Sequence, residues 1–183
     1  MNYEAILFLI NGFEEIEAIT PLDILRRGGV NVVSASLMGK LEVTGAHNIT
    51  IQADMLFEEI ETIDGAMLIL PGGPGTANYK KHDPLLEMLN MHNAKGDPIA
   101  AICAAPTILG MLGMLGDKSA VCHPSKESEL KAKRLLADAV VTDGNITTSR
   151  AAGTSVAFGL ELVRLLKGSA AAHDIAAAML HMV

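Results

Sequence analysis

Cys103 is the residue of this 183-residue chain whose position best suits it to covalent chemistry. It stands between an apolar run of strand length, residues 98–102, and an apolar segment of helical character, residues 104–109. A helix start presents free N–H groups and the positive end of its dipole, so we expect the thiol pKa to be lowered. Small neighbours permit the sharp turn of a nucleophile elbow. The simpler interpretation is a small apolar residue that fills the junction.

Glu17 is the second candidate, in the first turn of a helix predicted over residues 15–27. It shares an apolar face of that helix with Ile24, so burial is expected to raise its carboxyl pKa. A protonated carboxyl beside a thiolate forms a workable acid/base pair. The alternative is an acid that only complements the helix dipole. We favour that alternative for Glu14 and Glu15, and we expect Glu15 to point away from Glu17.

Two further groups follow predicted strands. Gly72 and Gly73 allow backbone N–H groups to approach a ligand closely, and the N–H groups of Gly73 and Ala104 together would form an oxyanion site. An ordinary strand-to-loop turn is the alternative. His123 follows a predicted strand over 118–122 and is placed to exchange protons with Cys103, unless it is a solvated loop histidine.

Other cofactor and metal chemistry finds no support in the sequence. The remaining histidines show no paired ligand spacing, so no metal site is predicted. The run Gly72 to Gly75 fits neither the dinucleotide fingerprint nor the P-loop. Cys122 neighbours His123 but should face the opposite side of its strand, in the core.

Composition points to one soluble domain over residues 1–183. The formal net charge of −7 argues against nucleic acid as a partner. Two cysteines cannot build a disulfide framework and fit a reducing compartment. The first residues lack the basic region of a signal peptide, and no apolar run is long enough to span a membrane. We therefore expect a cytoplasmic protein.

Strands and helices alternate along the chain. Continuous apolar runs predict strands buried on both faces, and Asp-Gly at residues 143–144 predicts a hairpin. Helical crossovers between strands imply a mostly parallel sheet with helices on both faces and its active crevice at the carboxyl edge. The predicted strands cover 5–10, 30–35, 66–71, 98–102 and 118–122, the predicted hairpins 41–52 and 140–148, and the further helices 83–95, 154–166 and 170–182.

Several separated motifs together resemble the ThiJ/PfpI superfamily, and specifically its DJ-one branch. They are residues 12–17 (GFEEIE), 21–27 (PLDILRR), 70–73 (LPGG), 100–106 (AAICAAP), 123–124 (HP) and 148–150 (TSR). The resemblance covers nearly the whole chain. It implies a flavodoxin-like three-layer α/β sandwich of the class I glutamine-amidotransferase type and a homodimer. It also implies a reactive Cys103, a protonated Glu17, a nearby His123, and oxyanion donors from Gly73 and Ala104.

Departures from neighbouring branches narrow the function. PfpI-type peptidases carry a histidine directly after the cysteine, where this chain has Ala104. Class I glutamine amidotransferases carry a glutamate two residues after the histidine, where this chain has Ser125. These departures weaken both the peptidase and the glutaminase interpretation. His47 stands where the DJ-one branch often has an arginine, which weakens the case for an anion site beside Cys103.

Two functions of different classes follow from the resemblance. The first is a glyoxalase or deglycase, a lyase or hydrolase that needs no cofactor, metal or glutathione, with Cys103 as nucleophile. Its substrates would be methylglyoxal, glyoxal or their early protein adducts. The second is a non-enzymatic oxidative-stress sensor or redox-dependent chaperone, in which Cys103 is oxidised to a sulfinate that Glu17 stabilises.

Overall fold

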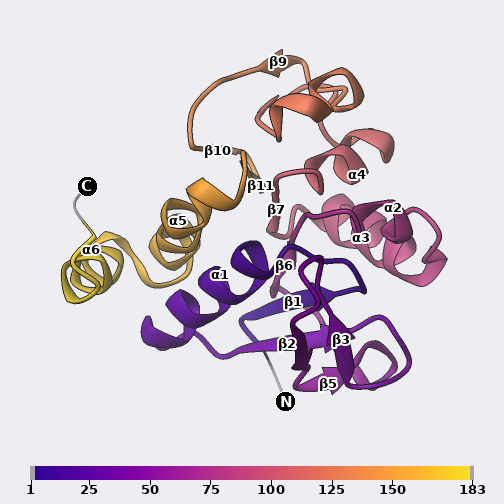
Figure 1. Cartoon of the computed structure of the whole chain (residues 1–183). Helices are drawn as coiled ribbons and strands as arrows, with labels where there is room; N and C mark the ends of the chain where they lie inside the picture. Colours follow the sequence, from indigo (N-terminus) through magenta and orange to yellow (C-terminus); the bar gives the residue numbers. More distant parts are fainter. Residues whose placement is uncertain (1–2, 182–183) are drawn as a thin grey trace.

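The protein is described by a computed structural model covering residues 3–181. Its centre is one seven-stranded sheet with the strand order β10-β11-β7-β6-β1-β2-β5 (Figure 1). All neighbours are parallel except the antiparallel pair β10 and β11. The strands are β1 (Ala5–Leu9), β2 (Val32–Ser36), β5 (Met55–Leu56), β6 (Met67–Leu70), β7 (Ile99–Ile102), β10 (Val140–Asp143) and β11 (Ile146–Ser149). The predicted flavodoxin-like α/β class is confirmed.

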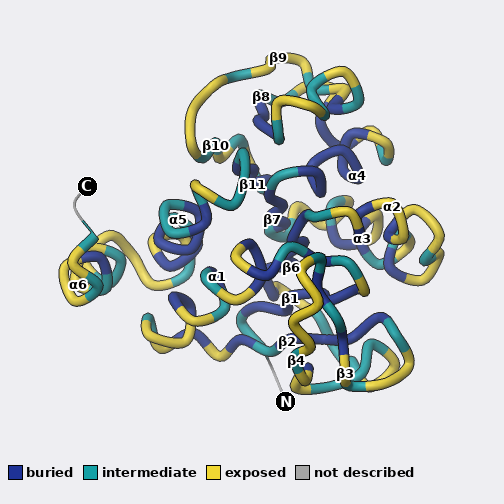
Figure 2. The backbone as a smooth tube through the Cα atoms, in the orientation of Figure 1, coloured by how far each residue is buried: buried dark blue, intermediate teal, exposed yellow. Residues whose placement is uncertain are grey.

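Two apolar cores cover the two faces of the sheet. Alternate residues of β1 show the division, because Ile6 and Phe8 belong to one core and Leu7 and Leu9 to the other. Helices α3 (Asp83–Lys95) and α4 (Pro106–Met111) pack on the first face. Helices α1 (Glu15–Arg27) and α5 (Ser155–Lys167) pack on the second, with α6 (Ser169–Ala178) outside α5. The central strands are accordingly buried throughout (Figure 2).

Most predicted elements form, with local differences. The hairpin of β3 (Glu42–Thr44) and β4 (Thr50–Gln52) is present, as is the β10–β11 hairpin. The strand predicted over 118–122 shrinks to β8 (Ser119–Ala120), which pairs with β9 (Arg134–Leu135) outside the main sheet. The helix predicted from residue 104 begins at Pro106. The last helix ends at Ala178, and Met182, the end of the predicted range, lies outside the described residues.

Short elements that the sequence did not suggest complete the loops. They are helix α2 (Thr76–Tyr79) and the 3₁₀ turns η1 (Phe57–Glu59), η2 (Pro124–Glu129) and η3 (Ala152–Thr154). The two-residue strands β5 and β9 were not predicted either. Between residues 3 and 181, no helix is both long and apolar enough to cross a membrane.

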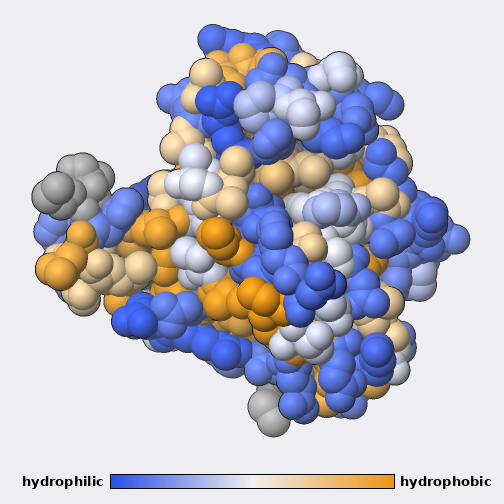
Figure 3. All heavy atoms as spheres, in the orientation of Figure 1, coloured by the Kyte–Doolittle hydropathy of each residue, from blue (hydrophilic) through white to orange (hydrophobic). Residues whose placement is uncertain are grey.

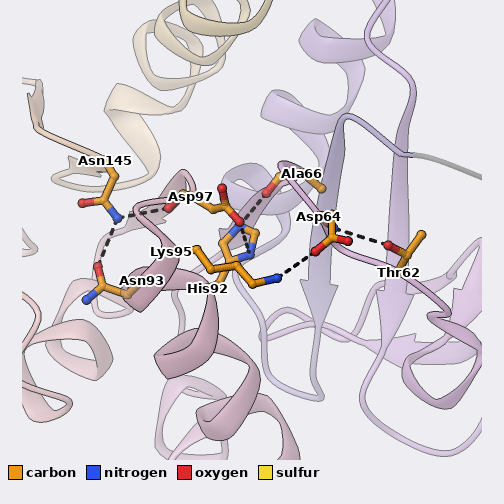
Figure 4. A network of polar contacts seen from close by, with 8 residues as sticks. All are labelled: Thr62, Asp64, Ala66, His92, Asn93, Lys95, Asp97 and Asn145. Atoms are coloured by element: carbon orange, nitrogen blue, oxygen red, sulfur yellow. Dashed lines mark hydrogen bonds and ion pairs between the residues drawn. The ribbon is translucent and has the colours of Figure 1, made fainter.

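A polar network ties the C-terminal end of α3 to the sheet (Figure 4). The buried His92 ring donates from Nε2 to the carbonyl oxygen of Ala66, 2.7 Å away, and its Nδ1 lies 3.6 Å from a carboxylate oxygen of Asp97. Asn145, in the β10–β11 turn, donates to the Asp97 carbonyl and to the Asn93 side chain, both at 3.0 Å. These contacts hold α3 against the starts of β6, β7 and β11.

Candidate active site

Cys103 occupies a strained turn at the carboxyl end of β7. Its φ is +65°, a left-handed conformation that is uncommon for residues other than glycine and is concentrated at functional sites. Two backbone hydrogen bonds fix the turn: the Cys103 N–H donates to Ser149 O at 2.9 Å, and the His123 N–H donates to Cys103 O at 2.8 Å. The elbow expected from the sequence is therefore present, and its side chain is half-buried.

The backbone N–H groups of Gly73 and Ala104 lie close enough to the Cys103 sulfur to lower its pKa. Gly73 reaches this position with φ +98°, and a Cβ there would lie 2.5 Å from the Glu14 nitrogen. A Cβ on Gly72 would meet the Glu17 carboxylate at 2.6 Å and the Cys103 Cβ at 2.7 Å. Both glycines are thus required by close approach. The structure brings the two predicted N–H donors to one point beside the thiol.

Glu17 lies beneath the thiol, with 1% of its surface exposed. Its Oε2 accepts a 3.1 Å hydrogen bond from the Gly72 N–H, and the Cys103 thiol and the Ala152 N–H lie close enough to the carboxylate to lower its pKa. Burial raises the pKa of Glu17 to about 7, against the lowering effect of those groups. The pKa direction expected from the apolar face of α1 is confirmed.

The thiol pKa moves opposite to the sequence expectation. Burial, followed by the nearby charge of Glu17, raises the pKa of Cys103 to about 12, although the Gly73 and Ala104 N–H groups lower it. The expected lowering was wrong because α4 begins only at Pro106 and has six residues, so its dipole does not offset these effects. Above about pH 7 the pair therefore holds one proton, on sulfur, with Glu17 placed to accept it.

His123 contacts Cys103 through its backbone N–H, and its ring contacts Ser125. The ring Nδ1 lies 2.8 Å from Ser125 Oγ and 3.2 Å from the Ser125 nitrogen, so the imidazole caps η2. Its expected proton exchange with Cys103 stays a prediction. Cys122 is buried in the core, as expected, with its sulfur 3.4 Å from the His123 carbonyl oxygen.

Glu15, expected only to complement the helix dipole and to point away from Glu17, is buried. It is 5% exposed, because the β3–β4 turn covers it and His47 bonds it twice, with the backbone N at 2.7 Å and Nδ1 at 2.8 Å. Burial opposes ionisation, but these hydrogen bonds outweigh it and lower the Glu15 pKa. The same bond, with the charge of Glu14, raises the pKa of His47.

Three ligand atoms of this group, one each from Glu14, Glu15 and His47, lie within 4.8 Å of one another. They are the side chains in residues 3–181 whose spacing would suit a cation, although His47 Nδ1 already hydrogen-bonds Glu15. Paired histidine spacing in the sequence does not reveal this group, because the β3–β4 hairpin brings its members together.

Ala152 was also missed as a site residue. Its N–H reaches Glu17 from η3, the turn that follows β11. The motif at residues 148–150 lies immediately before this turn and was the only sequence signal for it. A backbone donor carries no side-chain signature, so residue type alone does not identify it.

Comparison with known proteins gives matches in sequence over most of the chain. Residues 4–165 match the sequence model of the DJ-1/PfpI family. Protein dj-1beta of Drosophila melanogaster is 34% identical over 183 residues, which cover 98% of each chain. A Pyrococcus abyssi protein named as a deglycase is 34% identical over 157 residues, covering 85% of this chain and 94% of its own.

Solved structures share the fold over the full length. The crystal structure of Drosophila DJ-1beta superposes with a TM-score of 0.92 at 32% identity and covers 100% of both chains. Oxidised Toxoplasma gondii DJ-1 gives a TM-score of 0.93 at 32% identity and covers 99% of this chain and 100% of its own.

Proposed function

This chain belongs to the DJ-1/PfpI family, and from that premise we propose that it is a cysteine-dependent glyoxalase or deglycase acting on methylglyoxal, glyoxal or their early protein adducts. The observation that carries the proposal is the Cys103 thiol beside the buried Glu17 carboxyl, whose pKa of about 7 suits a general base at neutral pH. The deglycase name of the archaeal relative supports the substrate class.

In the first step, Cys103 Sγ adds to the aldehyde carbon while its proton passes to the Glu17 carboxylate. The N–H groups of Gly73 and Ala104 stabilise the negative charge on the former aldehyde oxygen. That oxygen then takes the proton back from Glu17, which gives a neutral hemithioacetal and restores the base. His123, next to the elbow, assists proton movement.

In the second step, Glu17 removes the proton of the former aldehyde carbon and returns it to the neighbouring ketone carbon. The two carbons exchange oxidation states, so no external oxidant is needed, and a 2-hydroxy thioester results. Water then breaks the C–S bond and releases the 2-hydroxy acid and the thiol. When the substrate is a protein adduct, Cys103 Sγ displaces the amine of the modified protein, which leaves with the thiol proton. The later steps are the same, and the hydrolysis again consumes one water.

The test is lactate formation from methylglyoxal without glutathione or added metal. Wild type should turn over, and Cys103→Ser should abolish turnover while the fold, followed by circular dichroism, stays intact. A wild type that forms no lactate with its thiol shown to be reduced would contradict the proposal. The same assay on pre-formed protein adducts, with free methylglyoxal removed, distinguishes the two activities. A deglycase turns these adducts over, and a glyoxalase does not.

Redox sensing through Cys103 is the second candidate, and the half-buried thiol beside Glu17 favours it. The solved structure of Toxoplasma gondii DJ-1, which shares the fold, is of an oxidised form. A protonated Glu17 would donate to a Cys103 sulfinate. Peroxide treatment followed by mass spectrometry tests this, because Glu17→Gln retains a donor and should still form the sulfinate while losing turnover.

A homodimer is the proposed assembly. Ile16 and Ile19 on α1 and Ile49 beside β4 are 52%, 41% and 52% exposed. Figure 3 shows apolar surface gathered over α1 on the face drawn there. Exposed apolar residues that cluster on one face are typical of a protein interface.

A further inference from the structure

A small cavity adjoins the two oxyanion donors on the side of α2 and η2. Its volume is about 170 Å³, and Gly73 and Ala104 form part of its wall. The remainder of the wall includes Thr76, Lys80, Lys126 and Glu129. At roughly 30 Å³ for each water-sized group, it has room for a short chain of about five non-hydrogen atoms. A substrate carbonyl held by the two N–H groups would therefore have a place for its tail.

The cavity has a positive balance of charge. Glu129 pairs with both lysines, with 2.6 Å to Lys126 Nζ and 3.5 Å to Lys80 Nζ. Two ammonium groups thus share one carboxylate, and one positive charge is left over. This contrasts with the whole chain, whose formal net charge is −7. A local positive balance at a concave site attracts an anionic group.

Thr76 adds a hydrogen-bonding group to the same wall. The residue is 5% exposed, and within the described part of the chain its Oγ1 has no hydrogen-bond partner. Buried hydroxyls nearly always have a partner, and each exception needs an explanation. A polar group that enters the cavity would supply one.

We propose that this cavity is a subsite for the anionic tail of the substrate, and that the preferred substrate is a 2-oxoaldehyde whose tail carries a carboxylate. The inference rests on the proposed function for the reaction at the aldehyde carbon and adds which aldehydes are preferred. Lys126 and Lys80 attract the carboxylate, Thr76 donates to it, and the chemistry at Cys103 is unchanged.

Turnover tests the substrate preference directly. The ratio of kcat/KM for 4,5-dioxopentanoate to that for its uncharged counterpart 2-oxopentanal should exceed one in the wild type. Lys126→Met should lower this ratio about threefold, and Glu129→Gln should raise it by a similar factor, as expected for partly exposed charges. A role confined to stability would not move the two variants in opposite directions. Lys81→Met is the matched control, because Lys81 is exposed and does not line the cavity.

Alkylation of Cys103 tests the subsite without relying on turnover. The rate with iodoacetate relative to iodoacetamide, normalised to free thiol, should fall in Lys126→Met and rise in Glu129→Gln. If these shifts occur but no variant turns over aldehydes, the subsite stands and the proposed function fails. The subsite proposal is overturned if the ratio of the iodoacetate rate to the iodoacetamide rate is unchanged in both Lys126→Met and Glu129→Gln. It is also overturned if Lys81→Met changes that ratio equally.

Discussion

At the scale of single residues, the site works by sharing one proton between two buried groups. Burial raises the pKa of both Cys103 and Glu17, so neither is ionised without cost. The thiol need not be ionised in advance, because Glu17 takes its proton as the C–S bond forms. The reactive species is then the pair and not a free thiolate.

The pH dependence of turnover follows from this pairing. As the pH falls through about 7, Glu17 becomes protonated and loses its role as base, so kcat/KM for methylglyoxal should fall with the loss of one ionisation. Glu17→Gln should lower kcat/KM by about 10²–10⁴-fold and remove this inflection. A variant that keeps the inflection near pH 7 would assign it to another group.

Gly73 should tolerate no side chain. Gly73→Ala combines a positive φ with a Cβ 2.5 Å from the Glu14 nitrogen, so the loop must shift and the N–H must leave the sulfur. We expect turnover to fall about 100-fold, as when one oxyanion donor is removed. Gly29→Ala is the control, because Gly29 also has a positive φ (+68°) but no atom within 4 Å of the added Cβ. Equal losses in both variants would refute the role of close approach.

At the scale of elements, each strand supplies the site through the loop that follows it. β1 leads to α1 and Glu17, β6 to Gly73, β7 to Cys103, and β11 to Ala152. The sheet holds these four strands in one block, and its carboxyl edge collects their loops. The pairing between these strands therefore fixes the positions of the site residues relative to one another.

The sequence predicts this framework better than it predicts local environments. Apolar runs identified the main strands, and helical spacing placed Glu17 correctly on the buried face of α1. Helical spacing gave no indication that Glu15 is buried, because the β3–β4 turn that covers it lies some thirty residues further along the chain. The predicted direction of the thiol pKa was wrong for a similar reason, because that pKa depends on the burial and charge that distant segments bring to Cys103.

The anchor of α3 should be sensitive to acid. Burial lowers the pKa of His92, opposed by its bond to Ala66 and by Asp97. The unfolded chain therefore binds a proton at a pH at which the folded protein does not, so His92 favours folding above about pH 6.5 and progressively less below it. Urea unfolding at pH 7.5 and 5.5 should show a smaller loss of stability in His92→Gln than in wild type. His173→Gln, at an exposed position, should match the wild type; an equal loss in all three would contradict the assignment.

At the scale of the whole molecule, helix α6 and the exposed apolar face of α1 take no part in the proposed reaction. Helix α6 falls beyond the part of the chain that matches the family model, which ends at residue 165. It packs on α5 and leaves α1 uncovered on the face that carries Ile16 and Ile19. The apolar surface of α1 is thus free for a second copy of the chain.

A charge on this surface should dissociate the proposed dimer. Ile16→Glu places an unpaired carboxylate in the proposed interface, so light scattering after size exclusion should change from the mass of two chains to that of one. Leu180→Glu, at a position 89% exposed beyond α6, should remain dimeric. A wild type of single-chain mass, or an Ile16→Glu variant that stays dimeric, would show that α1 is not the interface.

Because the site is built from segments far apart in the chain, the reactivity of Cys103 can be used as a probe of folding. Its surroundings join segments from Glu17 to Ala152, so they form only after contacts between distant parts of the sequence have been made. Such contacts require slow closure of long loops. Until then the sulfur carries the reactivity of an ordinary cysteine in a flexible peptide. Brief pulses of a thiol label during refolding would therefore report the moment at which the last strand reaches its place.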